Sequence, residues 1–422
     1  MSNFAYKKKI LHCEGISIGE LCRKKETPFY LYSSKTIKSN FNSLKQQLKG
    51  TKHIIAYAVK ANSNIAILKY LANLGAGADV VSLGELKKAN IAGIPYKKIV
   101  YSGVGKKDEE IAFAIEAGIL QFNVESHEEL LRIAEIAKQK KKKANIAMRV
   151  NPDVIAGGHP KISTGKKYDK FGISIEEAVE AYKYAKNIDS LNVIGIDMHI
   201  GSQIVKVGPF KSAFNKIVEY TRILEKLGIV VKNIDLGGGI GINYMKENTT
   251  GLIKNYSELV KNVYKKLNKN IIIEPGRYLV GDAGILITKI IFKKNSLGKN
   301  FLIVDAGMND FMRPALYSAR HIIKNIELDD KKTPISKYDI VGPICETADI
   351  FAENLKFNSA IKAGDILYIE KVGAYGSVMS SNYNTREAIE EIMVSNKKYY
   401  TIRKKTTIQE IIDKEKIPTW LL

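Results

Sequence analysis

The middle of the chain alternates short apolar runs with longer amphipathic segments. The runs have the length of buried strands, and segments such as Leu83–Ala92, Asp108–Ala117 and His127–Lys138 repeat apolar residues at helical spacing. Eight such alternations within roughly 230 residues are typical of a (β/α)₈ barrel, an α/β fold, and an open doubly wound sheet is the alternative. The predicted strands are Ile54–Lys60, Ala78–Ser82, Ile99–Gly103, Leu120–Glu125, Asn145–Asn151, Val193–His199, Asn233–Gly239 and Ile271–Arg277.

Beyond about residue 280 the pattern changes to short β-rich runs, and helical spacing returns only in Arg386–Met393. Near the N-terminus, the strand-like run Phe29–Tyr32 does not fit the barrel count. We therefore predict a barrel domain of residues 36–280 and a second, mainly β domain of residues 1–35 and 281–422. The later β runs are Gly284–Phe292, Asn300–Ala306, Tyr338–Gly342 and Asp365–Ile369.

Composition narrows the class of protein. The chain has 422 residues, 45% of them hydrophobic, which suits two globular domains. The net charge of +22 comes from lysines spread along the whole chain, so we predict no nucleic-acid partner, and the densest run, Lys140–Lys143, is interpreted as a solvated helix end. No apolar run has the length of a membrane span or of a signal peptide core. The three cysteines have neither disulfide-framework nor zinc-site spacing, so we expect a cytoplasmic protein without a metal.

The predicted strands end in chemically useful residues, and active sites of such barrels lie at the carboxyl ends of the strands. Lys60 closes the first run, where it is either a lysine that binds an aldehyde cofactor covalently or a side chain that reaches solvent along its apolar stem. Gly237–Gly239 follow the seventh strand, where glycines allow a phosphate to approach the backbone; the alternative is a tight turn.

Two further strand ends carry ionisable groups. Glu274, in Glu274-Pro275-Gly276-Arg277, can hold a pyridine nitrogen protonated, or can pair with Arg277. His199 can lie against a planar cofactor, although a lone histidine is more often structural.

The β domain has candidates of its own. Cys345 precedes Glu346, and a thiol with an ordinary pKa is protonated at neutral pH and can donate a proton. Arg313 and Tyr317 lie in Arg313-Pro314-Ala315-Leu316-Tyr317, where a guanidinium can fork onto a carboxylate. Tyr375 can present its phenol to a ligand. Taken one by one, these residues are more often an inert thiol, a surface ion pair and a core tyrosine.

Together the motifs resemble the pyridoxal-phosphate (PLP) decarboxylases with the alanine-racemase fold, known as fold type III, and most closely the diaminopimelate decarboxylases. The resemblance extends from about Gly15 to Tyr383. Its motifs occur in the family's order: Tyr57-Ala58-Val59-Lys60-Ala61-Asn62, His199-Ile200-Gly201-Ser202, Gly237-Gly238-Gly239, Glu274-Pro275-Gly276-Arg277, Arg313-Pro314-Ala315-Leu316-Tyr317, Cys345-Glu346 and Gly373-Ala374-Tyr375.

The resemblance implies a role for each matching residue. Lys60 would bind the cofactor aldehyde, His199 would stack on its ring, Glu274 would hold the ring nitrogen, and Cys345 would protonate the carbon that loses CO₂. Residues matching substrate-binding positions are Arg277, Arg313, Tyr317, Glu346 and Tyr375. Residues matching cofactor-binding positions are Lys60, His199, Ser202, Gly237, Gly238, Gly239, Glu274, Pro275, Gly276, Arg277 and Tyr375.

The family further implies a homodimer, because its cysteine reaches the active site of the second subunit, and decarboxylation of meso-2,6-diaminopimelate to L-lysine. Residues 157–172 resemble the family's mobile active-site loop, with Asp169 where serine is more usual. Ornithine or arginine decarboxylases are the nearest alternatives, but they usually carry aspartate after the cysteine. Alanine racemases pair the ring nitrogen with arginine, where this chain has Glu274. A carboxynorspermidine-type decarboxylase and a non-catalytic PLP-binding relative are more distant alternatives.

Overall fold

The computed structural model describes residues 3–156, 170–245, 247–328 and 333–422. The chain divides into two compact units: a barrel unit, Lys38–Asn243 with Glu247–Leu279, and a β-rich unit, Met1–Ile37 with Tyr244–Lys246 and Val280–Leu422. Tyr244 belongs to the β-rich unit although it lies within the barrel's stretch of sequence. The sequence pattern did not predict this.

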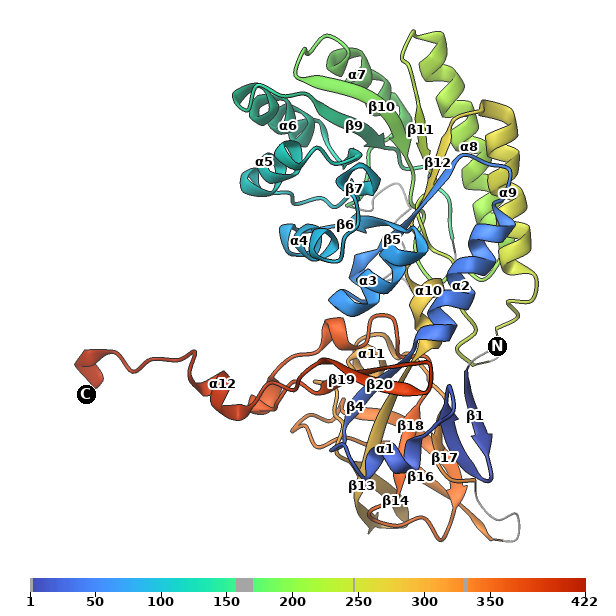
Figure 1. Ribbon diagram of the computed structural model, residues 1–422, viewed down its shortest axis with the longest axis vertical. Coiled ribbons are helices and arrows are strands. Elements are labelled where there is room, and N and C mark those ends of the chain that lie inside the picture. Colours follow the sequence, from blue (N-terminus) through green and yellow to red (C-terminus); the bar gives the residue numbers. More distant parts are fainter. Residues whose placement is uncertain (1–2, 157–169, 246, 329–332) are drawn as a thin grey trace. The chain divides into compact units, whose positions relative to one another are not determined.

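Eight parallel strands close the barrel unit, as the sequence predicts (Figure 1). The ring follows the order of the chain, and β12 (Asn270–Ile273) pairs with β5 (His53–Ala58) to complete it. Because the ring is closed, the open-sheet alternative is wrong. The strands between these two are β6 (Gly77–Val80), β7 (Ile99–Tyr101), β8 (Gln121–Val124), β9 (Ala144–Arg149), β10 (Leu191–Asp197) and β11 (Asn233–Asp235).

Short capped connections join the strands to the helices of this unit. Ser82 and Ser126 accept the N–H groups of Glu85 and Glu129 at 3.2 and 3.1 Å and so begin the helices that follow β6 and β8. These caps fix the chain close to the carboxyl ends of the strands. The helices are α2 (Ser34–Gln47), α3 (Ile65–Leu74), α4 (Leu83–Ile91), α5 (Asp108–Ala117), α6 (His127–Gln139), α7 (Ile175–Ala185), α8 (Val207–Lys226) and α9 (Leu252–Leu267).

The barrel strands carry buried polar side chains as well as apolar ones. A small apolar cluster contains Ala56, Val100 and Ile272. Beside it, Asn233 donates to Gln121 at 2.9 Å, and Gln121 donates to Asn123 at 2.8 Å. All three amides are buried, and such groups must find hydrogen-bond partners inside the barrel.

A large mixed sheet forms most of the β-rich unit, together with a small sheet of β1 (Phe4–Lys7), β2 (Ile10–Cys13) and β3 (Ile16–Ser17). The four later β runs are confirmed as strands, and Phe29–Tyr32 lies in β4, between β13 and β19. The order is β17 (Ile350–Asn358), β16 (Ile335–Val341), β14 (Lys299–Val304), β13 (Gly284–Ser296), β4 (Phe29–Ser33), β19 (Glu390–Ser395) and β20 (Lys398–Arg403), with β18 (Ile366–Ile369) and β15 (Ile323–Asn325) alongside.

The predicted helix at Arg386–Met393 is wrong. The segment enters strand β19, which pairs parallel with β4 and antiparallel with β20. Ile392 and Val394 both lie in the apolar core of the unit, which is the alternation of a strand. Glu391, immediately before Ile392, is buried and accepts hydrogen bonds from Tyr32 and Ser377. The tertiary partner strands therefore override the local helical spacing.

The remaining helices are short: α1 (Ile18–Cys22), α10 (Arg277–Val280), α11 (Arg313–Tyr317) and α12 (Ile408–Ile412). Among the described residues, no helix combines the length and the apolar character that a bilayer crossing requires.

Candidate active site

Lys60 lies directly after β5, in a single 3₁₀ turn of Val59–Ala61 at the carboxyl end of the strand. Its amine is 2.6 Å from a carboxylate oxygen of Asp79 on β6, and the Asp79 side chain is fully buried. The Lys60 side chain remains 35% exposed. The amine is thus anchored to a neighbouring strand while part of the side chain faces solvent, as an attacking amine requires.

Three carboxylates lie together in the barrel, from Asp197, Asp235 and Glu274, and one oxygen of each lies within 4.8 Å of the others. All three side chains are buried. Burial, reinforced by the charges of Asp235, Asp79 and Asp197, raises the pKa of Glu274 well above its usual range. Burial also raises the pKa of Asp197, and that of Asp235 to about 6. The cluster therefore needs protons or a neighbouring cation.

His199 follows β10 and is held as a neutral ring. Its Nδ1 accepts the N–H of Gly238 at 3.0 Å, which assigns the ring proton to Nε2. Burial, followed by the charges of Arg149 and Lys60, lowers the pKa of His199 well below its ordinary value. The 3.9 Å approach of Nδ1 to Glu274 is consequently not an ion pair, although its distance is that of one.

The glycine turn after β11 approaches its neighbours too closely for side chains. A Cβ on Gly238 would lie 2.1 Å from the carbonyl oxygen of Glu274, and one on Gly239 would lie 2.5 Å from that of Gly201. Gly239 also has a φ of +98°, which favours glycine. The N–H of Gly237 donates to Asp235 at 3.0 Å. With the Gly238 N–H donated to His199, the turn orients two site residues.

Residues that follow β12, the eighth barrel strand, contact residues at the carboxyl ends of β5 and β10, the first and sixth strands. The carbonyl of Pro275 accepts the Ala58 N–H at 3.3 Å, and a Cβ on Gly276 would meet Ala61 at 2.9 Å. Arg277 is buried and donates to the Ser202 hydroxyl at 3.0 Å. The structure thus brings Ser202 and Arg277, which both match cofactor-binding positions, into direct contact.

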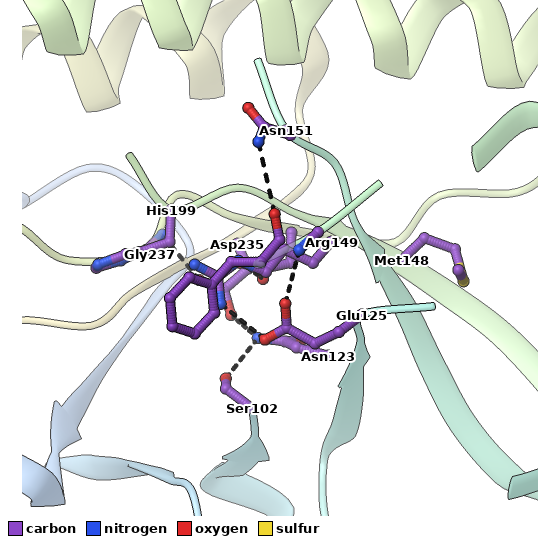
Figure 2. Close-up of polar contacts among 12 residues, drawn as sticks. Ser102, Asn123, Glu125, Met148, Arg149, Asn151, His199, Asp235 and Gly237 are labelled. Carbon is purple, nitrogen blue, oxygen red and sulfur yellow. Dashed lines mark hydrogen bonds and ion pairs between the residues drawn. The ribbon is translucent and has the colours of Figure 1, made fainter. Parts of the chain in front are cut away.

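Sequence reasoning missed several site residues in the interior of the barrel. The amide of Asn123 donates to Ser102 and Asp235 at 3.2 Å each (Figure 2). It also donates to Glu274 at 3.4 Å. Asp79, Asn123, Arg149, Asp197 and Asp235 all lie inside predicted apolar strands. Polar residues in buried strands need hydrogen-bond partners. Their occurrence inside otherwise apolar runs is the sequence signal that would have identified these five residues.

Arg149, on β9, connects two of these strands. It donates to Glu125 at 2.7 Å, and its guanidinium lies 4.9 Å from the ring centre of Phe171. Glu125 also accepts the N–H of Gly172 at 2.8 Å. Most of the predicted active-site loop, including Asp169, lies outside the described residues, but its last residues are held by these contacts.

In the β-rich unit, Cys345 and Glu346 lie exposed on the turn between β16 and β17. The backbone N–H of Cys345 donates to Asn384 at 3.0 Å. The carboxylate of Glu346 accepts the phenol of Tyr383 at 2.6 Å, and that hydrogen bond is the main cause of a raised pKa of Tyr383. Tyr383 is a further residue at this site that the sequence analysis did not single out.

Arg313 begins α11 and is buried among aromatic rings. Its guanidinium carbon lies 5.0 Å from the ring centre of Tyr244 and 5.9 Å from that of Tyr317. Its Nε donates to His321 at 3.4 Å, and the other ring nitrogen of His321 lies 2.9 Å from the carbonyl of Glu370. Tyr244 thus contributes to the surroundings of Arg313, because its ring lies against this arginine, which is predicted to bind a carboxylate.

Tyr375 adopts a left-handed backbone with φ of 55° between Ala374 and Gly376. Ser377, two residues after Tyr375, anchors the turn because its hydroxyl donates to the buried carboxylate of Glu391 at 3.0 Å. Tyr32 donates to the same carboxylate at 2.6 Å. These buried bonds fix the segment that presents Tyr375.

Comparison with known proteins gives one consistent result. Residues 34–281 match the family described as pyridoxal-dependent decarboxylase, pyridoxal binding domain. The diaminopimelate decarboxylase of Aquifex aeolicus is 43% identical over 408 residues, which are 97% of this chain and 96% of that protein.

Solved structures agree. The diaminopimelate decarboxylase from Helicobacter pylori complexed with L-lysine has a TM-score of 0.89 at 43% identity and covers 93% of this chain and 98% of its own. That from M. jannaschii, in co-complex with L-lysine, has a TM-score of 0.93 at 39% identity and covers 100% of this chain and 99% of its own. The chain therefore belongs to the pyridoxal-dependent decarboxylases and, within them, to the diaminopimelate decarboxylases.

Proposed function

We propose that this protein is a carboxy-lyase that converts meso-2,6-diaminopimelate to L-lysine and CO₂, the last step of lysine biosynthesis, with PLP as its cofactor. One observation carries the chemistry: a barrel mouth that holds both a lysine amine, paired with buried Asp79, and the buried acid Glu274. The substrate assignment is supported by the match to diaminopimelate decarboxylases over 97% of the chain.

The residues at the barrel mouth fit PLP. Lys60 offers an amine for its aldehyde. The carboxylate cluster around Glu274, with its raised pKa values, suits a protonated ring nitrogen, because a nearby cation relieves the repulsion among buried acids. Gly239 has no side chain, so the cofactor phosphate can approach its backbone N–H closely. Since the N–H groups of Gly237 and Gly238 bind Asp235 and His199, we assign the phosphate contact of this turn to Gly239 and the residues after it.

When bound, the cofactor supplies an electron sink for the electron pair that departing CO₂ leaves behind. Glu274 holds the proton at the ring nitrogen, which deepens that sink. His199 packs as a neutral ring, so it adds no positive charge that would compete with the protonated nitrogen. Lys60 would hold the cofactor by its aldehyde and would give way there to the substrate amine.

The β-rich unit provides the groups proposed to bind the substrate. Arg313 and Tyr317 bind the carboxylate that remains in the product, because a guanidinium can fork onto a carboxylate. Glu346, oriented by Tyr383, binds the distal ammonium group. Cys345 donates the proton to the carbon that lost CO₂. Tyr375 of the same unit and Arg277 of the barrel unit complete the set of proposed substrate contacts.

A panel of possible substrates tests this assignment against the ornithine and arginine decarboxylases, whose substrates lack the second carboxylate. The holoenzyme is assayed for CO₂ release from meso-diaminopimelate, ornithine, arginine and lysine. We expect kcat/KM for diaminopimelate to exceed the others by at least about 100-fold, since a site built to bind a charged group leaves that group unpaired with the wrong substrate. Faster turnover of ornithine or arginine would show that diaminopimelate is not the preferred substrate. The proposed cofactor chemistry would still hold.

We further propose a cytoplasmic homodimer in which Cys345 and Glu346 reach the active site of the partner subunit. If so, Lys60→Ala and Cys345→Ala, each nearly inactive alone, should restore activity when the two chains are co-expressed. Random mixing makes about half of the dimers mixed, each with one intact site of two, so about a quarter of wild-type activity should return for isologous pairing. Isolation of the doubly tagged dimer makes the assay direct. Activity no higher than that of the parents would place the site within one chain.

A further inference from the structure

The turn that carries Cys345 and Glu346 is exposed, yet it is closed by a tight set of bonds. The Gly342 N–H donates to the carbonyl of Asp349 at 3.0 Å, and the Asp349 N–H donates to that of Glu346 at 3.1 Å. The backbone from Gly342 to Asp349 therefore folds back on itself. Asp349 is only 3% exposed, whereas the residues that precede it are exposed to solvent.

The Asp349 carboxylate binds the backbone of two separate segments. One oxygen accepts the N–H of Ile344 at 2.7 Å, and the other accepts the N–H of Met308 at 2.7 Å. Ile344 is the residue immediately before Cys345. A Cβ on Gly342 would lie 2.3 Å from the same carboxylate, so only glycine permits this approach. Asp349 thus ties the base of the turn to the segment that follows β14.

Asn384 holds the turn from another segment. Its side-chain oxygen accepts the N–H of Cys345 at 3.0 Å, and its backbone is left-handed, with φ 56° and ψ 27°. The amides of two consecutive residues, Ile344 and Cys345, are therefore bound by side chains that come from different parts of the unit. Two adjacent amides fixed in this way leave the cysteine backbone little freedom to rotate.

We infer that Asp349 and Asn384 are positioning residues that hold the Cys345 thiol where it delivers its proton. The inference rests on the proposed role of Cys345 as the proton donor. A general acid must lie within hydrogen-bond reach of the atom it protonates, and small displacements of a catalytic group lower rates strongly. Within its own chain the turn is exposed, so packing inside that chain does not supply this precision, and the two side-chain bonds supply it instead.

The test compares three variants of the PLP-loaded enzyme. Asp349→Asn replaces one acceptor by an amide N–H that faces a donor, and Asn384→Gly removes the acceptor while it retains a residue that adopts the left-handed backbone. Asp365→Asn is the matched control, because Asp365 also accepts a backbone N–H, that of Lys362 at 2.9 Å, in an exposed turn of the same unit. Amide hydrogen exchange, kcat and the PLP dissociation constant are measured for each.

We expect exchange at Ile344 and Cys345 to accelerate at least about tenfold in Asp349→Asn, with the barrel amides unchanged. In Asn384→Gly, only the Cys345 amide should accelerate. For both variants kcat should fall at least about tenfold while PLP affinity holds, and the control should match wild type. Unchanged exchange and kcat in Asn384→Gly, which is exposed and should fold normally, would overturn the inference.

A double-mutant cycle separates this inference from the proposed function. If Asp349 acts through the thiol, Asp349→Asn should have little further effect on the residual activity of Cys345→Ala, whereas independent effects would multiply. Multiplied effects would contradict positioning. A fully active Cys345→Ala would instead remove the proton-donor role, while the hydrogen-exchange result would still decide whether Asp349 holds the turn.

Discussion

The barrel mouth and the Cys345 turn hold reactive groups in opposite ways. In the barrel, Glu274 and Asp235 are buried among other charges, and burial raises both pKa values. On the turn, Cys345 and Glu346 are exposed, and the fixed part is the backbone beneath them. The barrel therefore tunes its groups electrostatically, in a low-dielectric interior, while the turn positions them by hydrogen bonds to the chain. Substitutions should separate the two strategies.

The largest effect is expected from Lys60→Ala in the barrel. Without the amine, the cofactor aldehyde has no covalent attachment, so both the visible absorbance of the bound cofactor and the turnover should be lost, the latter by at least about a thousandfold. Lys88→Ala serves as the control, because Lys88 donates at 3.1 Å to Ser63 in the same unit. Normal turnover in Lys60→Ala with PLP bound would remove the proposed mechanism.

Cys345→Ala should have the next largest effect, a loss of about 100-fold in kcat, since general acid catalysis typically contributes that much or more. The turn depends on the cysteine backbone rather than on its thiol, so hydrogen exchange there should not change. Cofactor absorbance should also remain that of wild type. Cys22→Ala is the matched control in the same unit, and its kcat is expected to be normal. Equal activity of the two variants would assign the proton to another donor.

Glu274→Gln tests the electrostatic strategy of the barrel directly. The amide keeps the shape of the side chain but carries no charge toward the ring nitrogen. One lost charge-assisted hydrogen bond is worth roughly 1.5 to 3 kcal/mol, so kcat should fall about tenfold to 100-fold while PLP remains bound. Steady-state kinetics at saturating substrate provide the measurement. A turnover number equal to that of wild type would show that the ring nitrogen does not depend on Glu274.

The remaining expected effect is on stability rather than on turnover, and it concerns Asp235. Its pKa is raised to about 6 in the folded protein, so between about pH 4 and 6 the folded state binds more protons than the unfolded state. Stability from this group is therefore present at low pH and is lost as pH rises. In Asp235→Asn the free energy of unfolding should therefore fall less as pH rises, by up to about 3 kcal/mol. Urea unfolding of the cofactor-free protein measures this difference. Parallel pH profiles of the two proteins would contradict the raised pKa.

The site residues differ in how far sequence could find them. Lys60, Glu274 and Cys345 stand at strand ends or in turns within recognisable motifs, and were predicted from those motifs. Asp79, Asn123 and Asp235 lie inside strands, where a linear pattern does not say which strands face one another. Closure of the barrel brings Asn123 on β8 within 3.4 Å of Glu274 after β12, across 151 positions of sequence.

The sequence by itself determined the eight strand–helix alternations, the β-rich second unit and the residues at the strand ends, because hydrophobic period and motif spacing are local properties. Only the tertiary structure decided the rest. Residues 390–395 became a strand because β4 and β20 offer it hydrogen-bond partners. Tyr244 joined the β-rich unit, and Asn384 came to bind the Cys345 amide across 39 positions of sequence, because long-range contacts form only when distant segments pack together.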